Sequence, residues 1–237
     1  MKKVRDLISN LSLEQLTNES YIENNLLLKL GLNSENLNEQ PVELSEHYGS
    51  GLGLRIWQYP NQFSKYLVFL SQYAAKINSY MEIGSRYGGT FVTHCEYLRC
   101  FNESFSKSVA VDLIEIPPLL KEYCSFNKNS FFKQSDSTSE EFSQYLNGEF
   151  FDLVFIDGDH SYEGVLSDSE KTRNISNIQV FHDITSDPCP GVAEYWRKIK
   201  EECSETYNFY EFTDQYDSVD GTFLGIGVAV RKNWLTV

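Results

Sequence analysis

Short apolar segments alternate with amphipathic segments through the middle of the chain. Runs rich in Val, Ile, Phe and Tyr predict strands, and segments with apolar residues three or four positions apart predict helices. The predicted strands span residues 80–83, 108–111, 130–133, 151–156 and 178–181, and the helices between them span residues 90–100, 118–126, 139–146, 162–173 and 192–203. This alternation predicts βαβ units in a mostly parallel α/β sheet with helices on both faces.

The N-terminal part of the chain departs from this alternation. Residues 4–16 and 20–30 have the apolar spacing of two helices, and Gly31 is a natural stop for the second. An Asn-rich polar stretch follows. We therefore divide the chain into residues 1–47, a helical cap or oligomerisation segment that makes a homo-oligomer plausible, and residues 48–237, the main domain.

The main domain also has distinctive ends. It opens on a glycine-rich aromatic loop that leads into a predicted helix at residues 61–77. It closes on two consecutive predicted strands, residues 207–212 and 222–231, which are joined by a polar turn. A strand that follows another strand without a helix between them predicts an antiparallel hairpin at the end of the sheet.

Composition narrows the classes of function. The 237 residues carry a net charge of -14, which argues against nucleic acid as a partner because nucleic-acid binding depends on clustered Lys and Arg. No apolar run approaches the roughly 18 residues of a membrane span, and the start of the chain has no apolar signal segment. The five scattered cysteines match neither a disulfide framework nor a zinc ribbon, so we expect reduced thiols and a cytoplasmic protein without a membrane partner.

A glycine loop follows the first predicted strand. In MEIGSRYGGT, residues 81–90, the glycines Gly84, Gly88 and Gly89 allow the backbone to pass close to a ligand. The spacing differs from the dinucleotide pattern G-x-G-x-x-G, and the Lys-Ser/Thr pair of a P-loop is absent, so NAD and nucleoside triphosphates are disfavoured. A tight turn without any ligand is the alternative interpretation.

The next two strand ends favour a ligand at this loop. Asp112 follows the second predicted strand about 20 residues beyond the glycine loop, where an acid commonly accepts hydrogen bonds from a ribose. Asp136 follows the third, within reach of an adenine amino group. Because ligands of open α/β sheets bind beyond the carboxyl ends of the strands, these groups together predict a nucleoside-like ligand.

Titratable residues gather after the fourth and fifth strands. Asp157, Asp159 and His160 follow the fourth strand, and His182 and Asp183 follow the fifth. Unpaired carboxylates at one rim of a sheet are costly to bury, and a divalent cation would resolve that cost. Oxygen ligands suit Mg²⁺, Ca²⁺ or Mn²⁺, whereas a histidine ligand favours Mn²⁺, Fe²⁺ or Zn²⁺. Alternatively, the aspartates cap the following helix and His182 is a satisfied strand-end histidine.

These motifs resemble a known family. EIGSRYGGT, AVDL, FIDGDHSYEG, FHDI, PGVAEYW and FLGIGVAV, in this order, resemble class I S-adenosylmethionine-dependent methyltransferases, and more narrowly the branch of cephalosporin-pathway and macrolide or aminocoumarin sugar O-methyltransferases. The resemblance covers roughly residues 48–231. It implies a Rossmann-like three-layer sandwich whose mostly parallel, seven-stranded sheet ends in an antiparallel C-terminal hairpin.

The resemblance also implies a cofactor site for S-adenosylmethionine. The residues that it places around the methionine part of the cofactor are Glu82, Gly84, Ser85, Tyr87 and Gly88. It places Asp112 at the ribose, Asp136 at the adenine, and Asp157 at both the cofactor cleft and an ion. Arg86 departs from the small residues of such loops, and binding of a carboxylate and simple solvent exposure are equally good interpretations of it.

The resemblance further implies a metal and a base. Related metal-dependent enzymes hold a divalent ion such as Mg²⁺ or Mn²⁺ at the positions of Asp157, His182 and Asp183, although an acid is frequent where His182 stands. His160 or Asp159 would then remove the acceptor's proton, and we favour His160 because the ordinary pKa of histidine is near neutrality.

The predicted function is S-adenosylmethionine-dependent O-methylation, assisted by a divalent metal, of a hydroxyl on a small molecule such as a sugar, a glycan precursor or a natural-product scaffold. The alternatives are an NAD-dependent oxidoreductase, which shares the sheet but not the glycine spacing, and a non-catalytic S-adenosylmethionine-binding module. In such a module, Asp157, His160 and Asp183 would be dispensable.

Overall fold

A central sheet organises the computed structural model, which describes residues 1–35 and 38–234. Within these residues seven strands form one sheet in the order β3-β2-β1-β4-β5-β7-β6. The strands are β1 (Ser79–Ile83), β2 (Lys107–Asp112), β3 (Ser130–Gln134), β4 (Phe151–Ile156), β5 (Ser176–His182), β6 (Tyr207–Phe212) and β7 (Ile226–Arg231). β1 to β5 run parallel to one another, and β7 runs antiparallel to both β5 and β6. The predicted mostly parallel sheet with an antiparallel C-terminal hairpin is confirmed.

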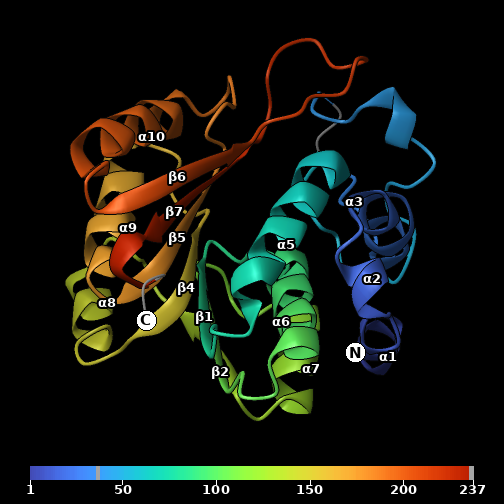
Figure 1. The fold of residues 1–237 in the computed structure, drawn as a ribbon, viewed down its shortest axis with the longest axis horizontal. Coiled ribbons are helices and arrows are strands. Elements are labelled where there is room, and N and C mark those ends of the chain that lie inside the picture. The colour runs from blue at the N-terminus through green and yellow to red at the C-terminus, as the bar shows by residue number, and fades with distance from the viewer. Residues whose placement is uncertain (36–37, 235–237) are drawn as a thin grey trace.

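Helices cover both faces of this sheet, as Figure 1 shows. The helices of the main domain are α5 (Pro60–Ala74), α6 (Gly89–Phe101), α7 (Pro118–Phe126), α8 (Glu140–Tyr145), α9 (Tyr162–Arg173) and α10 (Pro190–Cys203). In Figure 1, α5, α6 and α7 lie on one side of the strands and α8, α9 and α10 on the other. This is the predicted three-layer sandwich. The central strands β1, β4 and β5 are almost entirely buried, because apolar side chains pack against helices on both faces.

The N-terminal helices form a further layer against α5 and α6 (Figure 1). They are α1 (Lys2–Ser9), α2 (Leu13–Leu16), α3 (Glu19–Tyr21), the π-helix η1 (Ile22–Leu27) and α4 (Leu28–Leu30), and the 3₁₀ helix η2 (Val42–Leu44) follows. Val4, Ile8 and Leu27 belong to the same hydrophobic cluster as Phe63 of α5. Residues on both sides of position 47 therefore share one core, and the boundary drawn there stays a prediction.

The predicted helix at residues 4–16 is wrong in its continuity. Ser12 accepts a hydrogen bond from the backbone N–H of Gln15, and the Gln15 side chain accepts one from the N–H of Ser12. This reciprocal capping box starts a new helix, so α1 ends before it. The predicted helix at 20–30 is confirmed as a continuous helical run over residues 19–30, with the π-helical stretch η1 in its middle.

The last strand is shorter than predicted. β7 begins at Ile226 rather than at residue 222, because Leu224 and Gly225 have φ of 59° and 95° and turn the chain out of the ladder. Thr185 donates its backbone N–H to the carbonyl of Leu224 at 3.2 Å. The loop before β7 is thereby tied to the segment that follows β5.

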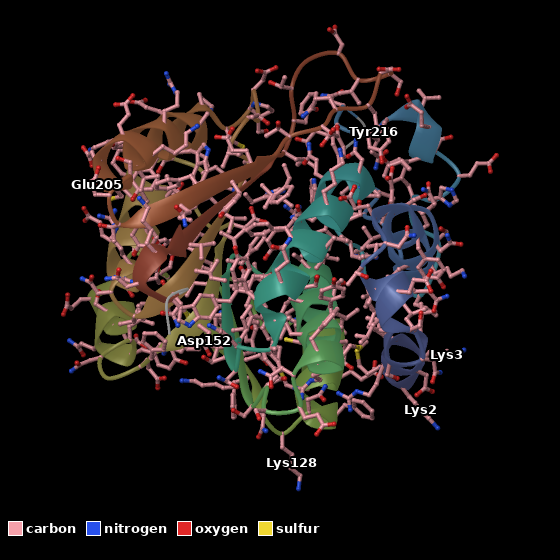
Figure 2. All side chains as sticks on the ribbon, in the orientation of Figure 1. Lys2, Lys3, Lys128, Asp152, Glu205 and Tyr216 are labelled. Atoms are coloured by element: carbon pink, nitrogen blue, oxygen red, sulfur yellow. The ribbon has the colours of Figure 1, made fainter. Side chains whose placement is uncertain are left out.

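Strand register determines which side chains meet at the carboxyl end of the sheet. Ile83 pairs with Ile156 across β1 and β4, and Ile156 pairs with Phe181 across β4 and β5. The next residues, Asp157 and His182, are therefore neighbours. At the opposite end of β4, Asp152 accepts hydrogen bonds from the backbone N–H of Asn78 and the side chain of Asn177, and Figure 2 labels it at the lower end of the sheet.

Two segments far apart in sequence meet above the carboxyl end. The chain between β6 and β7 lies beside the N-terminal segment at the top of Figure 1, and Figure 2 labels Tyr216 there. The backbone N–H of Val42 donates to Ser218 Oγ at 2.8 Å, and the ring of Tyr216 packs edge-on against Tyr59 at 5.4 Å.

Among the described helices, none combines the length and apolarity that crossing a membrane requires.

Candidate functional site

A cavity of about 1050 Å³ opens at the carboxyl ends of β1, β2, β4 and β5 and at the loop after β3. This is the position at which open α/β sheets bind their ligands. Every residue predicted as a site residue lines it: Glu82, Gly84, Ser85, Tyr87, Gly88, Asp112, Asp136, Asp157, Asp159, His160, His182 and Asp183. The structure thus brings the predicted residues together, while what each of them binds stays a prediction.

The glycines after β1 serve contacts within the protein. Gly84 has φ of 82°, and a Cβ there would lie 1.9 Å from the carbonyl oxygen of Asp157. Gly88 has φ of 87°, and its Cβ would lie 2.3 Å from Leu120 Cγ. The backbone conformation and the space both require glycine. Gly84 therefore lets the loop after β1 cross the end of β4 at close range. These glycines were expected from the sequence to allow close approach to a ligand, and this contact within the protein was not predicted.

Polar groups at the first two strand ends are arranged around this loop. Ser85 is buried, and its Oγ has no hydrogen-bond partner among the residues that the structure describes. Asp112 accepts hydrogen bonds from the backbone N–H groups of Arg86 at 2.6 Å and Ile114 at 3.1 Å. These contacts orient the Asp112 carboxylate at the cavity wall, where each oxygen retains lone-pair capacity.

The third strand end is more exposed. Asp136 Oδ1 accepts hydrogen bonds from the backbone N–H of Thr138 at 2.8 Å and from its hydroxyl. The hydrogen bonds from Thr138 lower the pKa of Asp136, so its carboxylate is charged at neutral pH. A ligand at this edge would meet a fixed acceptor.

Arg86 connects the glycine loop to the N-terminal segment. Its guanidinium lies over the Trp57 ring at 4.0 Å and within 3.2 Å of Glu35 Oε2, and Tyr87 donates its hydroxyl to the same carboxylate at 2.9 Å. Trp57 in turn donates to Glu39 Oε2 at 3.2 Å. Sequence reasoning missed Glu35 and Glu39, because nothing in an Asn-rich polar stretch marks two of its acids as part of a cavity mouth.

Four titratable side chains converge at the ends of β4 and β5. His182 Nδ1 lies 3.0 Å from Asp157 Oδ1 and 3.4 Å from Asp183 Oδ2. His160 lies on the cavity side of the group. Its Nε2 is 3.4 Å from Asp157 Oδ1, and its Nδ1 is 3.4 Å from Asp183 Oδ2. Asp183 has φ of 62°, a left-handed conformation that aspartate tolerates better than most residues. One donor atom from each of Asp157, His182 and Asp183 can be chosen so that all lie within 4.8 Å of one another.

The charges in this group support one another. Burial by itself would raise the pKa of Asp157, but His182 and His160 outweigh it and hold that pKa at about 2. The hydrogen bonds of Asp157 and Cys189 raise the pKa of His160 to about 11. Burial acts to lower the pKa of His182, yet Asp157 and Asp183 raise it to about 10. Without a cation, the group therefore consists of two imidazolium rings and two carboxylates.

Two further residues lie beside this group. Cys189 is buried, and its Sγ lies 3.1 Å from His160 Nδ1. Asp159 accepts the backbone N–H of Ser161 at 2.9 Å and so orders the turn before α9. It lies outside the two groups of possible metal ligands that the described residues form. No motif in the sequence pairs position 189 with position 160.

Asp168 is a buried carboxylate behind the cavity wall. It lies on α9, and a Cβ added to Gly158 would be 3.1 Å from Asp168 Oδ2. Neither of its carboxylate oxygens has a hydrogen-bond partner within the described part of the chain. Burial raises the pKa of Asp168 to about 6. The sequence places it on a helix but carries no signal of this environment.

A second histidine is buried on the other side of β1. His94 Nε2 lies 3.1 Å from the Tyr66 hydroxyl, and its Nδ1 lies 3.1 Å from the Tyr80 hydroxyl and 2.9 Å from the Thr90 carbonyl. Tyr80 also donates to Glu82. Burial lowers the pKa of His94 to about 3 and raises that of Glu82 well above its usual range. His94 is therefore a neutral packing residue, as its mid-helix position indicates.

Comparison with known proteins agrees with this architecture. Residues 81–184 match the family model described as a methyltransferase domain. No curated protein matches the chain. The segment from β1 to the turn after β5 is thus the part of the chain that is recognisably related to a family by sequence.

Solved structures with the same fold are distant in sequence. An O-methyltransferase from Bacillus cereus in complex with SAH is 14% identical, with 74% of this chain and 82% of that chain covered and a TM-score of 0.52. A putative O-methyltransferase from Klebsiella pneumoniae is 14% identical, with coverage of 74% and 81% and a TM-score of 0.53. A putative rRNA-methylase from Clostridium thermocellum is 10% identical, with coverage of 72% and 97% and a TM-score of 0.51.

Two of these names state only O-methylation and the third states rRNA, so the shared fold does not identify the acceptor. The strand order, the cavity at the strand ends and the sequence match nevertheless agree with one another. Residues 81–184 match a methyltransferase domain by sequence, and the chain around them has the fold of class I S-adenosylmethionine-dependent methyltransferases.

Proposed function

We propose that this protein is an O-methyltransferase that moves a methyl group from S-adenosylmethionine to a hydroxyl of a small molecule, with assistance from a divalent cation. The observation that carries the proposal is the position of Asp157, His160, His182 and Asp183. Each of the two histidines lies 3.0 to 3.4 Å from both aspartates. All four side chains line the same cavity as Asp112 and Asp136, the acids proposed to bind the nucleoside part of the cofactor.

The proposed cofactor site is the half of the cavity formed by β1, β2 and the loop after β3. The unpartnered Oγ of Ser85, which is buried in the glycine loop, fits a polar ligand there. Glu82, Gly84, Tyr87 and Gly88 would surround the methionine part, Asp112 would accept from the ribose and Asp136 from the adenine amino group. The cofactor would supply an electrophilic methyl group on a sulfonium.

The proposed cation site consists of Asp157, His182 and Asp183. The residues fit a cation, because His182 Nδ1 lies 3.0 Å from Asp157 Oδ1 and 3.4 Å from Asp183 Oδ2, so that two carboxylates and an imidazole nitrogen converge. Mixed oxygen and nitrogen ligands suit Mn²⁺ and Fe²⁺ better than Mg²⁺. A cation there would act as a Lewis acid toward the acceptor hydroxyl and fix its orientation.

His160 is the proposed base. Its side chain is 43% exposed and faces the cavity, whereas that of His182 is 3% exposed. If Asp157 and Asp183 held a cation, their negative charge would no longer favour the imidazolium form of His160, and its ring nitrogen could accept the hydroxyl proton. Asp159 stays the alternative base, although its contact with Ser161 turns it toward α9.

A small acceptor is proposed from the shape and charge of the site. A cavity of about 1050 Å³ is comparable with the roughly 300 to 1000 Å³ of ordinary small-molecule sites, which leaves room for a cofactor and a compact acceptor. The net charge of -14 disfavours nucleic acid as the acceptor. A sugar, a glycan precursor or a natural-product scaffold fits this size and charge.

We also propose a cytoplasmic location, in keeping with five free cysteines, all of which lie in the described residues.

Calorimetric titration tests the cofactor first. We expect the purified protein to bind S-adenosylmethionine and its demethylated product, and not NADH. Binding of NADH in place of these ligands would support the oxidoreductase alternative and overturn the proposal.

Methyl transfer from isotope-labelled S-adenosylmethionine to a panel of free sugars, glycosides and hydroxylated aromatic glycosides tests the chemistry. EDTA treatment and Asp157→Ala should both abolish transfer. Asp152→Asn, at the other end of the same strand, is the matched control and should retain transfer. Transfer that survives both EDTA and Asp157→Ala would exclude metal assistance, and cofactor binding without transfer to any acceptor would favour the binding module.

A further inference from the structure

A second group of metal-type ligands lies beside the first. His160 Nδ1 is 3.1 Å from Cys189 Sγ and 3.4 Å from Asp183 Oδ2. One donor atom from each of His160, Asp183 and Cys189 lies within 4.8 Å of the others. Asp183 belongs to both groups, whereas Cys189 and His160 belong to the second group alone. The second group adds a sulfur to the donor set.

The spacing of these donors is close to that of a tetrahedral ion. With ordinary zinc–ligand distances, two nitrogen or oxygen ligands lie about 3.3 Å apart, and a nitrogen and a sulfur lie about 3.6 Å apart. The observed separation of 3.4 Å between His160 Nδ1 and Asp183 Oδ2 already matches. The separation of 3.1 Å between His160 Nδ1 and Cys189 Sγ has to widen by a few tenths of an ångström. A half-exposed imidazole can make that movement.

The fold holds Cys189 at this position. Cys189 precedes Pro190 at the start of α10, and its backbone N–H donates to the Ser186 carbonyl at 2.9 Å. A Cβ on Gly191 would lie 2.4 Å from the backbone nitrogen of Tyr162 and 2.9 Å from the carbonyl oxygen of His160. The glycine therefore allows the first turn of α10 to pack directly on the backbone that carries His160. This close packing brings the thiol to the imidazole independently of any ion pair.

We propose that His160, Asp183 and Cys189 form a second cation site that prefers a thiophilic divalent ion such as Zn²⁺. One sulfur, one nitrogen and one oxygen ligand leave a fourth tetrahedral position open to the cavity. Mg²⁺ and Ca²⁺ prefer oxygen ligands and are poorly served by this set. Binding forms a zinc–sulfur bond in place of the sulfur–hydrogen bond of Cys189 and a zinc–nitrogen bond in place of the Nδ1–hydrogen bond of the His160 imidazolium, and both displaced protons leave to solvent.

The second site has a consequence that rests on the proposed function. An ion on Nδ1 of His160 leaves the ring proton on Nε2, so the ring can no longer accept a proton from the acceptor. Zn²⁺ at the second site is therefore expected to inhibit methyl transfer while the first site keeps its own cation. Ion binding itself does not depend on the reaction being methyl transfer, so failure of one conclusion is distinguishable from failure of the other.

Absorption spectroscopy with Co²⁺ tests the site on the intact protein. Co²⁺ replaces Zn²⁺ in tetrahedral sites, and a thiolate ligand gives it a sulfur-to-cobalt charge-transfer band in the near ultraviolet. The EDTA-stripped and dialysed protein is titrated with Co²⁺ and then with excess Mg²⁺. We expect the charge-transfer band to develop and to survive the Mg²⁺.

Three variants assign the signal. Cys189→Ser should remove the band and weaken binding at this site by more than about 100-fold, since loss of even an indirect supporting contact costs about 10- to 100-fold. Asp157→Asn, which alters the first group alone, should keep the band. Cys203→Ser, a change of a part-buried thiol outside the site, should also keep it.

A wild-type protein without the band, or a band that persists in Cys189→Ser, would overturn the proposal. A second experiment uses only the wild-type protein, so it tests the site even if Cys189→Ser does not fold. Zn²⁺ should protect Cys189, and not Cys203, from alkylation by N-ethylmaleimide, as read by peptide mass spectrometry. Equal alkylation of Cys189 with and without Zn²⁺ would likewise refute the site.

Discussion

The chain buries two clusters that each combine histidine with a carboxylate, and the two behave in opposite ways. His94 lies among Tyr66, Tyr80 and Glu82, where burial lowers the pKa of the ring to about 3. His182 is as deeply buried, yet Asp157 and Asp183 raise its pKa to about 10. Burial is therefore shared by the two clusters and does not decide the charge of the ring.

The partners of each histidine decide its charge. Tyrosine hydroxyls and a backbone carbonyl satisfy both nitrogens of His94 without requiring a positive charge. The rim cluster, consisting of Asp157, His160, His182 and Asp183, instead pairs ionised groups and leaves His182 Nε2 without a partner among the described residues. The closed cluster stabilises the fold, and the open one has capacity for a ligand. Four substitutions test this division, beginning with the largest expected effect.

His160→Ala is expected to lower kcat by about 100- to 10 000-fold, the usual range for loss of a general base. The half-exposed ring contributes little packing, so the melting temperature should fall less than in the next variant. Steady-state methyl-transfer kinetics and a thermal melt measure the two effects. A kcat near that of the wild type would remove His160 from the mechanism and favour Asp159.

His94→Ala should show the reverse pattern. The ring is fully buried between Phe63, Tyr66 and Phe155, so its loss should cost about 3 to 5 kcal/mol of folding free energy. The protein that remains folded should keep a kcat close to the wild-type value. Urea unfolding and kinetics at low temperature measure this. A large loss of kcat in fully folded protein would show that the closed cluster also takes part in the chemistry.

Asp168→Asn separates burial from pairing, because Asp168 is as buried as His94 but lacks its partners. Burial raises the pKa of Asp168 to about 6. The native state therefore binds this proton more tightly than the unfolded state, and stability falls as pH rises from about 4 to 6. The variant should gain up to about 3 kcal/mol above pH 7 and close to nothing below pH 4. Urea unfolding at pH 4 and pH 8 checks both values, and an equal effect at both would contradict the assignment.

Arg86→Ala is expected to have the smallest effect. Its guanidinium is half exposed and already contacts Trp57 and Glu35, so we expect a loss of about 0.5 to 1 kcal/mol in stability. Affinity for S-adenosylhomocysteine by calorimetry should change little. A large loss of affinity would instead favour the interpretation of Arg86 as a ligand for a carboxylate.

The sequence predicted those features of the fold and the site that depend on short-range patterns of apolar and polar residues. Alternating apolar segments placed strands such as Phe151–Ile156 at their observed bounds, and the polar residues that end parallel strands identified the rim cluster. Capping chemistry at Ser12 was overlooked, so one helix was predicted where two occur. A polar residue at a strand end is a local signal, and local signals were enough for most of the site.

What escaped prediction depends on close packing between distant segments. Cys189 reaches His160 because Gly191 lets α10 approach the backbone before α9, and neither position carries a signal of the other. Glu39 joins the cavity through a hydrogen bond from Trp57, across a segment whose composition indicated a polar linker. Such contacts follow from tertiary packing and have no period in the sequence.

The roof of the cavity comes from outside the recognised domain. Trp57, Glu39 and Leu224 line the cavity, whereas residues 81–184 contribute the strand ends beneath them. Under the proposed function, the strand ends bind a fixed cofactor, whereas the roof segments face the acceptor. Grafting the roof segments of a relative onto this sheet is therefore a route to new acceptors, with the methyl-donor half left in place.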